Sequence, residues 1–261
     1  MLQLERIEEN LFRGWCHQTG WQRAFGGQVA AQALTAAGAT VPEERGVHSL
    51  HGYFIRGGRT DRPIVFEVER TRDGGSFTTR RVVAIQDGET IFSLSASFQR
   101  AEVSSEHQAR MPEVTAPEDG DIELFEPLPI RQSAIEARYI GDPTKGLPDV
   151  GRGPRQQLWV RAKDRLPDEP LAHVCALTYI SDIRLAGTAG LPHQAEPGEP
   201  QLASLDHAVW FHRPVRADEW LLFDMESPSY ASHRGLAHGE FFTVDGRLVA
   251  SVTQEVLIRR R

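Results

Sequence analysis

The second half of the sequence repeats the first at a nearly constant spacing, and this doubling constrains the fold more than any other feature. The Asp-Gly pairs at 87–88 and 245–246 are 158 positions apart, and each precedes the last strand predicted in its half. Asp-Gly favours the two-residue turn of a β-hairpin. Further matched positions, at a spacing of 157, are Phe54 with Phe211, Arg56 with Arg213 and Phe66 with Phe223. The chain is therefore predicted to contain two copies of one structural unit.

Each copy is predicted to consist of a helix followed by a four-stranded antiparallel meander. The first helix covers 28–39, a run of small and apolar residues that follows Gly26-Gly27 and stops before a proline. The second covers 168–181, with Asp168 as its N-cap and Pro170 in its first turn. The strands predicted from alternating residues between turns are 47–56, 64–72, 77–86 and 90–99 in the first half, and 157–162, 205–213, 220–227, 235–244 and 247–259 in the second.

The doubled pattern predicts an α+β architecture with a connecting segment in its middle. Residues 1–105 form the N-terminal repeat, 106–150 a proline-rich and charged linker, and 151–261 the C-terminal repeat. A helix on a curved antiparallel sheet must bury its apolar stripe against the inner face of that sheet. Two such units can pair their sheets edge to edge, which removes exposed edges. We therefore expect two helix-on-antiparallel-sheet repeats that share one continuous curved sheet.

Charge and cysteine content exclude several classes of protein. The 36 acidic residues outnumber the 29 basic ones, giving a net charge of −7, whereas binding to a nucleic-acid backbone needs a basic excess. Cys16 and Cys175 cannot form a disulfide framework, and their spacing predicts no zinc site. The sequence has neither a signal-peptide pattern nor an apolar run of about 18 residues. We expect a cytoplasmic protein that neither binds nucleic acid nor spans a membrane.

The last predicted strand contains one residue that breaks its pattern. Alternate residues Ala250, Val252, Val256 and Ile258 form an apolar face, and Gln254 lies in the middle of that face. Burying an amide without a hydrogen bond costs about 2 kcal/mol or more, so Gln254 needs partners. It is either a functional group in a polar pocket or a core glutamine that caps a stray backbone group.

Four further polar residues have both a functional and a structural interpretation. Asp182 follows the second helix, at the unfavourable negative end of its dipole, so it is either an exposed loop acid or a pocket carboxylate that serves as a base. Ser204 begins a strand without a Gly-x-Ser-x-Gly motif, which argues against a nucleophilic serine hydrolase. His48 and His51 lack a third metal ligand nearby, so a structural role is favoured for each.

Long ordered segments of the chain resemble the type II acyl-CoA thioesterases (TesB-like). The likeness includes Phe25-Gly26-Gly27-Gln28 in the first half, and Ser181-Asp182 and Leu205-Asp206-His207 in the second. It covers nearly the whole chain, and the middle linker matches least. The segments that carry it are 11–14, 25–34, 41–45, 48–54 and 72–77 in the first half, and 179–182, 205–207, 210–214 and 254–255 in the second.

This resemblance implies a double hotdog enzyme that hydrolyses acyl-CoA to a free acid and CoA. The family's catalytic positions fall on Asp182, Ser204 and Gln254, which together would hold and activate a water molecule. His48 matches a histidine considered functional in relatives and is a minor candidate. The backbone N–H of Gly27, at a helix N-terminus, is a candidate donor to the oxyanion. The family resemblance implies no metal or other cofactor, and it predicts a homo-oligomer.

Three other functions compete with this interpretation. The main rival is a non-hydrolytic acyl-CoA binding protein with the same double hotdog fold. A hotdog enoyl-CoA hydratase is disfavoured, because the Asp-x-Asn-Pro-x-His type of segment is missing from the sequence. The third alternative is a structural partner protein without an internal cavity.

Overall fold

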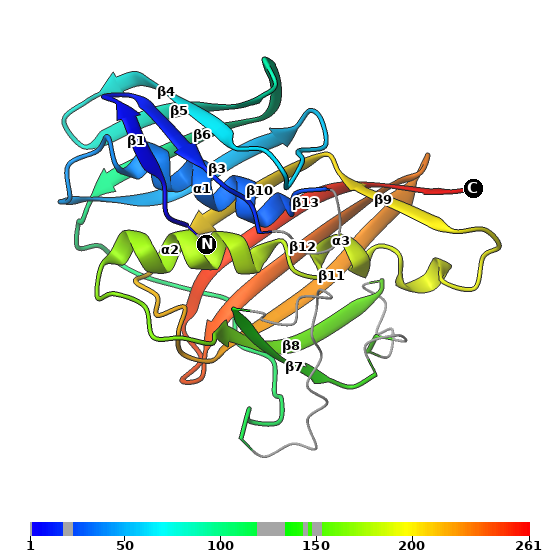
Figure 1. Cartoon of the computed structure of the whole chain (residues 1–261). Helices are drawn as coiled ribbons and strands as arrows, with labels where there is room; N and C mark the ends of the chain where they lie inside the picture. The colour runs from blue at the N-terminus through cyan, green and yellow to red at the C-terminus, as the bar shows by residue number, and fades with distance from the viewer. Residues whose placement is uncertain (1, 18–22, 119–133, 143–145, 148–152) are drawn as a thin grey trace.

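One antiparallel sheet extends through both halves of the chain, and two helices lie across one of its faces (Figure 1). The computed structural model describes residues 2–17, 23–118, 134–142, 146–147 and 153–261. Within these residues the sheet has 13 strands and is not closed into a barrel. None of the helices in this part of the chain is long and apolar enough to cross a bilayer. The predicted fold class, two helix-on-sheet units that share one sheet, is confirmed.

The elements follow the order that the sequence predicts, with several additions. The helices are α1 (Gly26–Gly38), α2 (Pro170–Ser181) and α3 (Leu185–Thr188), followed by a 3-10 turn, η1 (Leu191–His193). The strands are β1 (Glu5–Glu8), β2 (Leu11–Gly14), β3 (Arg45–Phe54), β4 (Ile64–Asp73), β5 (Phe77–Gln86), β6 (Glu89–Arg100), β7 (Ile135–Ile140), β8 (Arg155–Ala162), β9 (Pro200–Ser204), β10 (Asp206–Phe211), β11 (Leu221–Ala231), β12 (Arg234–Thr243) and β13 (Leu248–Arg260).

The order of the strands corrects the predicted meander. Strands β4, β5 and β6 are joined by hairpins as expected, but β3 pairs with β6 instead of β4. The second half shows the same departure, because β10 pairs with β13 and not with β11. A strand preceding each helix occupies the position that a meander would need: β2 pairs with β4, and β8 with β11. Strands β3 and β10 therefore each lie at the far edge of the hairpins of their own half.

Those displaced strands join the two halves. Strands β3 and β10 pair antiparallel, with Leu50 opposite Val209 and Tyr53 opposite Asp206. Beyond the paired residues, the Phe54 N–H donates to the carbonyl of Leu205 at 2.9 Å. The predicted edge-to-edge joining of the two sheets is thus confirmed, and the seam lies in the middle of the continuous sheet.

The internal repeat is visible in the side-chain contacts. After β3, the Arg56 guanidinium donates to the carbonyl of Thr90, at the start of the last strand of the first half, at 3.0 Å. After β10, Arg213 donates in the same way to the carbonyl of Leu248, at the start of β13, at 2.7 Å. The two arginines matched by the 157-residue spacing therefore make the same hydrogen bond in each half, to a backbone carbonyl at the start of the last strand.

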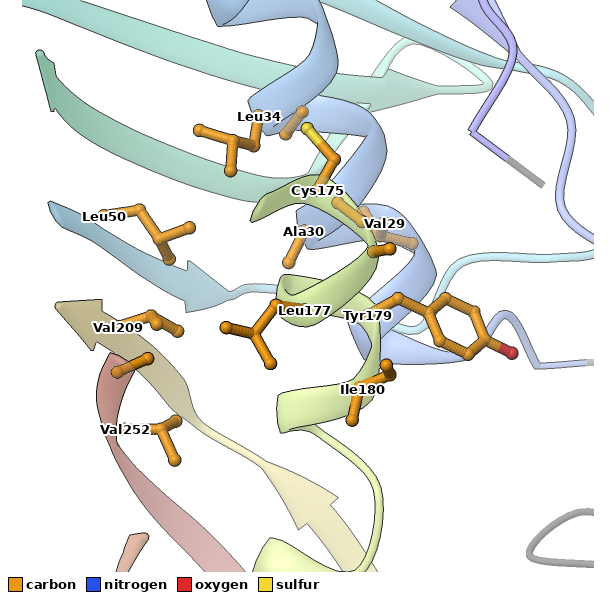
Figure 2. Packing of buried hydrophobic residues seen from close by; sticks show 14 of the residues in the cluster. Val29, Ala30, Leu34, Leu50, Cys175, Leu177, Tyr179, Ile180, Val209 and Val252 are labelled. Atoms are coloured by element: carbon orange, nitrogen blue, oxygen red, sulfur yellow. The ribbon is translucent and has the colours of Figure 1, made fainter. Parts of the chain in front are cut away.

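The two helices pack on each other and on the central strands. Figure 2 shows Leu177 of α2 directed toward Leu50, Val209 and Val252, which come from the three strands at the seam. Helix α1 is lined with alanines, and Ala30 is fully buried. Small side chains let α1 approach both α2 and the sheet closely, so the helix termini can reach the facing elements.

The described part of the segment between the halves contains regular structure that its composition does not predict. Of the predicted linker, residues 119–133, 143–145 and 148–150 lie outside the described residues. Its described part contains β7, whose residues alternate between apolar and polar inside a charged region. Ahead of β7, Met111 and Val114 pack on an apolar cluster that includes Trp159, and the Trp159 indole donates to the Thr115 carbonyl at 2.8 Å. Residues 111–115 of the linker thus cover part of the C-terminal sheet.

The start of α2 differs from its prediction in one residue. The N-cap is Glu169 and not Asp168, and its side chain makes no capping hydrogen bond. Asp168 instead pairs with Arg216, from the loop after β10. The strong guanidinium partner takes the carboxylate that would otherwise cap the helix, while Pro170 begins the helix as expected.

Candidate functional site

Three of the polar residues singled out from the sequence, Asp182, Ser204 and Gln254, are linked by the hydrogen bonds of Gln254 to the other two. The amide nitrogen of Gln254, Nε2, lies 2.8 Å from Oδ1 of Asp182 and 2.7 Å from Oγ of Ser204. Asp182 is the C-cap of α2, Ser204 ends β9, and Gln254 lies in the middle of β13. The fold therefore brings together residues that are up to 72 positions apart.

Gln254 occupies the apolar face of its strand, as the alternation predicted. It is fully buried, and its inward neighbours along β13 are Val252 and Val256. A carboxylate accepts hydrogen bonds and cannot donate them, so the contact with Asp182 fixes Nε2 on that side of the amide. The other amide atom, Oε1, is buried without a hydrogen-bond partner among the described residues. Oε1 of Gln254 can therefore accept a hydrogen bond from a molecule bound in the site.

Asp182 is stabilised by the helix of the other half. Its Oδ2 accepts the backbone N–H of Gly27, in the first turn of α1, at 2.7 Å. The N-cap of that helix, Phe25, offers no side-chain acceptor, so Asp182 supplies one of the missing partners for the free N–H groups. The carboxylate follows the negative end of α2 but also faces the positive end of α1. This second helix explains how an acid is tolerated at that position.

Burial makes Asp182 a weaker acid than an exposed aspartate. Loss of hydration raises the pKa of its carboxyl group to about 6, while the hydrogen bonds from Gln254 and Gly27 act in the opposite direction. A pKa of this size leaves the group mostly ionised at neutral pH, yet makes it a better proton acceptor than an ordinary carboxylate. Asp182 therefore has the properties of a general base.

The Gly26-Gly27 pair allows α1 to approach this carboxylate. A Cβ atom on Gly26 would lie 2.9 Å from Oδ2 of Asp182 and 3.0 Å from the ring of Phe54. A Cβ atom on Gly27 would lie 2.6 Å from the backbone oxygen of Tyr179. Real Cβ atoms do not approach other atoms so closely, so side chains at these positions would push the helix away from Asp182. The start of α1, which lies two residues before the predicted start at 28, is thus part of the site.

Two other predicted site residues are placed differently. An irregularity in the β3–β6 pairing puts His48 beside Ser97, 2.8 Å from its Oγ, and against the ring of Phe77. Phe54, whose ring lies beside Gly26, marks the end of β3 that is near the site. His48 is six residues before Phe54, which is roughly 20 Å along the strand, so we find His48 apart from Asp182, Ser204 and Gln254. The Gly27 N–H donates to Asp182 and is therefore engaged, which argues against the expected oxyanion role of this group.

Sequence reasoning missed the residues that surround the trio. His207 lies on β10 in the same inward-facing series as Val209 and Phe211, and it is fully buried. A polar residue on an apolar strand face is the same signal that identified Gln254. His207 contacts Ser181, the residue before Asp182, and this contact is invisible in a linear pattern.

Two hollows in the surface lie elsewhere. One, of about 500 Å³, is lined by residues between Asp61 and Gly88, and the other, of about 260 Å³, by residues between Arg161 and Glu219. Neither lining includes Asp182, Ser204 or Gln254. We therefore do not assign either hollow as the reaction chamber.

Comparisons with known proteins match both halves of the chain. Residues 144–257 match the family model described as acyl-CoA thioesterase, and residues 12–99 match that of the acyl-CoA thioesterase N-terminal domain. Acyl-coenzyme A thioesterase 8 of Homo sapiens is 40% identical, over 99% of this chain and 88% of that protein. Acyl-CoA thioesterase 2 of Haemophilus influenzae is 39% identical, over 99% of this chain and 96% of that protein.

Solved structures share the same fold. The acyl-CoA thioesterase II TesB2 of Mycobacterium marinum is 48% identical, with a TM-score of 0.87 over 100% of this chain and 96% of that one. A hot dog fold protein from Alicyclobacillus acidocaldarius is 24% identical, with a TM-score of 0.81 over 100% of this chain and 97% of that one. The latter similarity supports the fold alone.

Proposed function

This chain belongs to the acyl-CoA thioesterase family, and from that premise we propose that it hydrolyses fatty acyl-CoA through one water molecule activated by Asp182, Ser204 and Gln254. The observation that carries the proposal is the paired contact of the Gln254 amide with a carboxylate and a hydroxyl. A carboxylate, a hydroxyl and an amide within hydrogen-bond distance form a cradle for water. A thioester carbonyl is electrophilic enough for direct attack by such a water.

In the proposed reaction Asp182 acts as the general base. Its carboxylate takes one proton from the water, and the resulting hydroxide bonds to the carbonyl carbon of the thioester. The carbon–sulfur bond then breaks, and the electron pair leaves with the sulfur of CoA. The proton held by Asp182 passes to that thiolate, so the products are a free acid and CoA, and the carboxylate is regenerated.

Gln254 and Ser204 orient the water in this scheme. Gln254 uses Nε2 to hold Asp182 and Ser204, so its buried Oε1 accepts a hydrogen from the water. Ser204 accepts from Gln254 through Oγ, and its own proton is therefore directed toward the water or the substrate oxygen. Fixing the attacking oxygen near the carbonyl lowers the entropic part of the barrier.

Thiol release from acyl-CoA tests the proposal. A panel of short, medium and long acyl-CoA substrates, palmitoyl-CoA included, is expected to give steady release of CoA thiol, detected with a thiol reagent. The panel also ranks the acyl chain lengths. Tight binding of palmitoyl-CoA with no thiol release would instead favour the non-hydrolytic acyl-CoA binding protein.

The pH dependence of kcat/KM follows from the state of Asp182. Because only the ionised carboxylate accepts a proton, kcat/KM is expected to rise with pH and to reach half of its maximum near pH 6. Steady-state assays from pH 4 to 8 at constant ionic strength measure this acid limb. A midpoint near pH 4, the value of an exposed aspartate, would contradict a buried base at this position.

Two coarser expectations complete the proposal. We place the enzyme in the cytoplasm, since Cys16 and Cys175 are both free and buried, as in proteins of a reducing compartment.

We also propose that copies of the chain associate. Tyr53 is 66% exposed on β3, and Trp210 is 36% exposed on β10, at the seam of the sheet. Exposed aromatic residues of this kind are enriched in protein interfaces.

A further inference from the structure

Two adjacent residues at the start of β10 contact the neighbours of the proposed catalytic residues. The Asp206 carboxylate accepts the backbone N–H of Glu255, the residue after Gln254, at 2.6 Å. The His207 ring nitrogen Nε2 lies 2.8 Å from Oγ of Ser181, the residue before Asp182. One dipeptide is therefore tied to both of the elements that carry the carboxylate and the amide.

The hydrogen bonds define which atom of His207 donates. Ser181 gives its single hydroxyl proton to the carbonyl of Thr178, in the last turn of α2, at 2.9 Å. The Ser181 oxygen is then left as an acceptor, so Nε2–H of His207 is the donor. Burial lowers the pKa of His207 to about 4, and the ring is neutral in the pH range of the proposed reaction.

Packing alone does not account for His207. The ring is fully buried on the inward face of β10, where the next inward residues are Val209 and Phe211. Its Nδ1 has no hydrogen-bond partner among the described residues. An unpaired polar atom in a core is destabilising compared with an apolar side chain of similar size. A residue that is unfavourable for stability at this position has a role in holding Ser181.

We propose that Asp206 and His207 are positioning residues, which set the distance between the Asp182 carboxylate and the Gln254 amide by fastening Glu255 and Ser181. This inference rests on the proposed function, because it gives the dipeptide a part in orienting the same water. The backbone supports the arrangement, since the Leu205 N–H donates to the carbonyl of Glu255 at 2.9 Å. Ser204, Asp206 and His207 thus act from one short segment.

The matched pair His207→Leu and His207→Gln tests the role of the histidine. Leucine keeps the core filled but removes the donor, and α2 is then free to shift Asp182 relative to Gln254. We expect kcat to fall about 10-fold or more, KM to stay within about twofold and the acid limb of kcat/KM to move, because small displacements of a positioning group reduce rates strongly. Glutamine restores an N–H near the location of Nε2, and is expected to recover most of the lost kcat.

His212→Leu serves as the matched control, because His212 follows the other end of β10 and its ring lies at the surface, 2.9 Å from Oγ of Ser251. It is expected to keep both kcat and the pH profile. A second pair, Asp206→Ala and Asp206→Asn, repeats the test at the other contact, since asparagine retains an acceptor for the Glu255 N–H and alanine does not. Only the alanine variant is expected to lose turnover.

The outcomes separate the two proposals. An unmodified enzyme that releases no thiol would overturn the proposed function itself. An active enzyme whose His207→Leu and Asp206→Ala variants keep the original kcat and acid limb would overturn the positioning role alone. Circular dichroism melts of each variant identify any that fail to fold. If one variant of the His207 pair or of the Asp206 pair does not fold, the other pair tests the positioning role.

Discussion

Replacing Asp182 with asparagine is expected to lower kcat by about 10²–10⁴-fold, the usual contribution of a general base. The amide cannot accept the proton of the water, although it nearly matches the carboxylate in shape. Turnover of palmitoyl-CoA by purified enzyme measures the loss. Asp168→Asn is the control, because Asp168 precedes the other end of α2 and pairs with Arg216 at the surface. The control is expected to keep its activity.

The same substitution is expected to leave the chain folded and, above pH 6, at least as stable. Oδ1 of the asparagine can accept from Gly27, and its NH₂ can donate to Gln254 once that amide turns over. The pKa of Asp182 is about 6 in the fold against the ordinary value of 3.8, a difference of roughly 3 kcal/mol against the charged form. Near-normal turnover by a folded Asp182→Asn variant would exclude Asp182 as the base.

The sign of this effect sets a pH test for stability. A pKa that is raised in the folded state means that the folded chain holds the proton more tightly than the unfolded chain. The contribution of Asp182 is therefore fully present below about pH 4 and is lost as the pH rises through 6. Loss of this contribution lowers the melting temperature of the unmodified enzyme as the pH rises from 4 through 6. Thermal melts of the Asp182→Asn variant over the same pH range should not show that decrease.

The sequence was sufficient to identify each proposed catalytic residue but not their contacts. Gln254 was recognisable from the alternation of β13, because the rise of a strand places every second residue on one face. Asp182 was recognisable from its place after α2, whereas Ser204 depended on the family resemblance. The contact of Asp182 with Gly27 depends on how two helices from different halves cross, which no local pattern encodes.

The positions of the strands show the same limit. Hairpin turns fixed β4 to β6 as neighbours, since Asp-Gly is a local signal. The place of β3 was predicted wrongly, because it depends on β2 occupying the far edge of β4. Strand β2 has only four residues, and so short a strand carries little periodic signal. The position of β3 depends on pairing between strands that are far apart in the sequence, and local turn residues do not predict such pairing.

The first half holds a different polar group at the place that corresponds to the site. Ala96 matches Gln254 at a spacing of 158, and its register partner Arg80 matches Ala237, the partner of Gln254, at a spacing of 157. The Arg80 guanidinium is 1% exposed and donates to Thr40 at 2.9 Å and to Asp73 at 2.7 Å. A cation whose donors are occupied cannot accept a proton from water. The duplicated fold is therefore consistent with one hydrolytic centre, as we propose.

Substitution of Gln254 by leucine is expected to lower kcat by about 100-fold while the chain stays folded. Leucine has a similar size, and it removes the buried Oε1 that has no partner among the described residues. It also removes the hydrogen bond that lowers the pKa of Asp182, so the acid limb of kcat/KM is expected to move above pH 6. Rate and pH profile thus change together, because one amide both holds the water and tunes the base.

The measurement combines a pH profile with a thermal melt of the same preparation. Gln99→Leu, near the end of β6, is the control and is expected to keep both properties. If Gln254 were a core residue that satisfies a stray backbone group, the leucine variant would lose stability while its folded fraction kept the original kcat. A stable variant with slow turnover and a shifted acid limb instead assigns the amide to the reaction, since a residue that only satisfies a backbone group would leave the kcat and the pH profile of the folded enzyme unchanged.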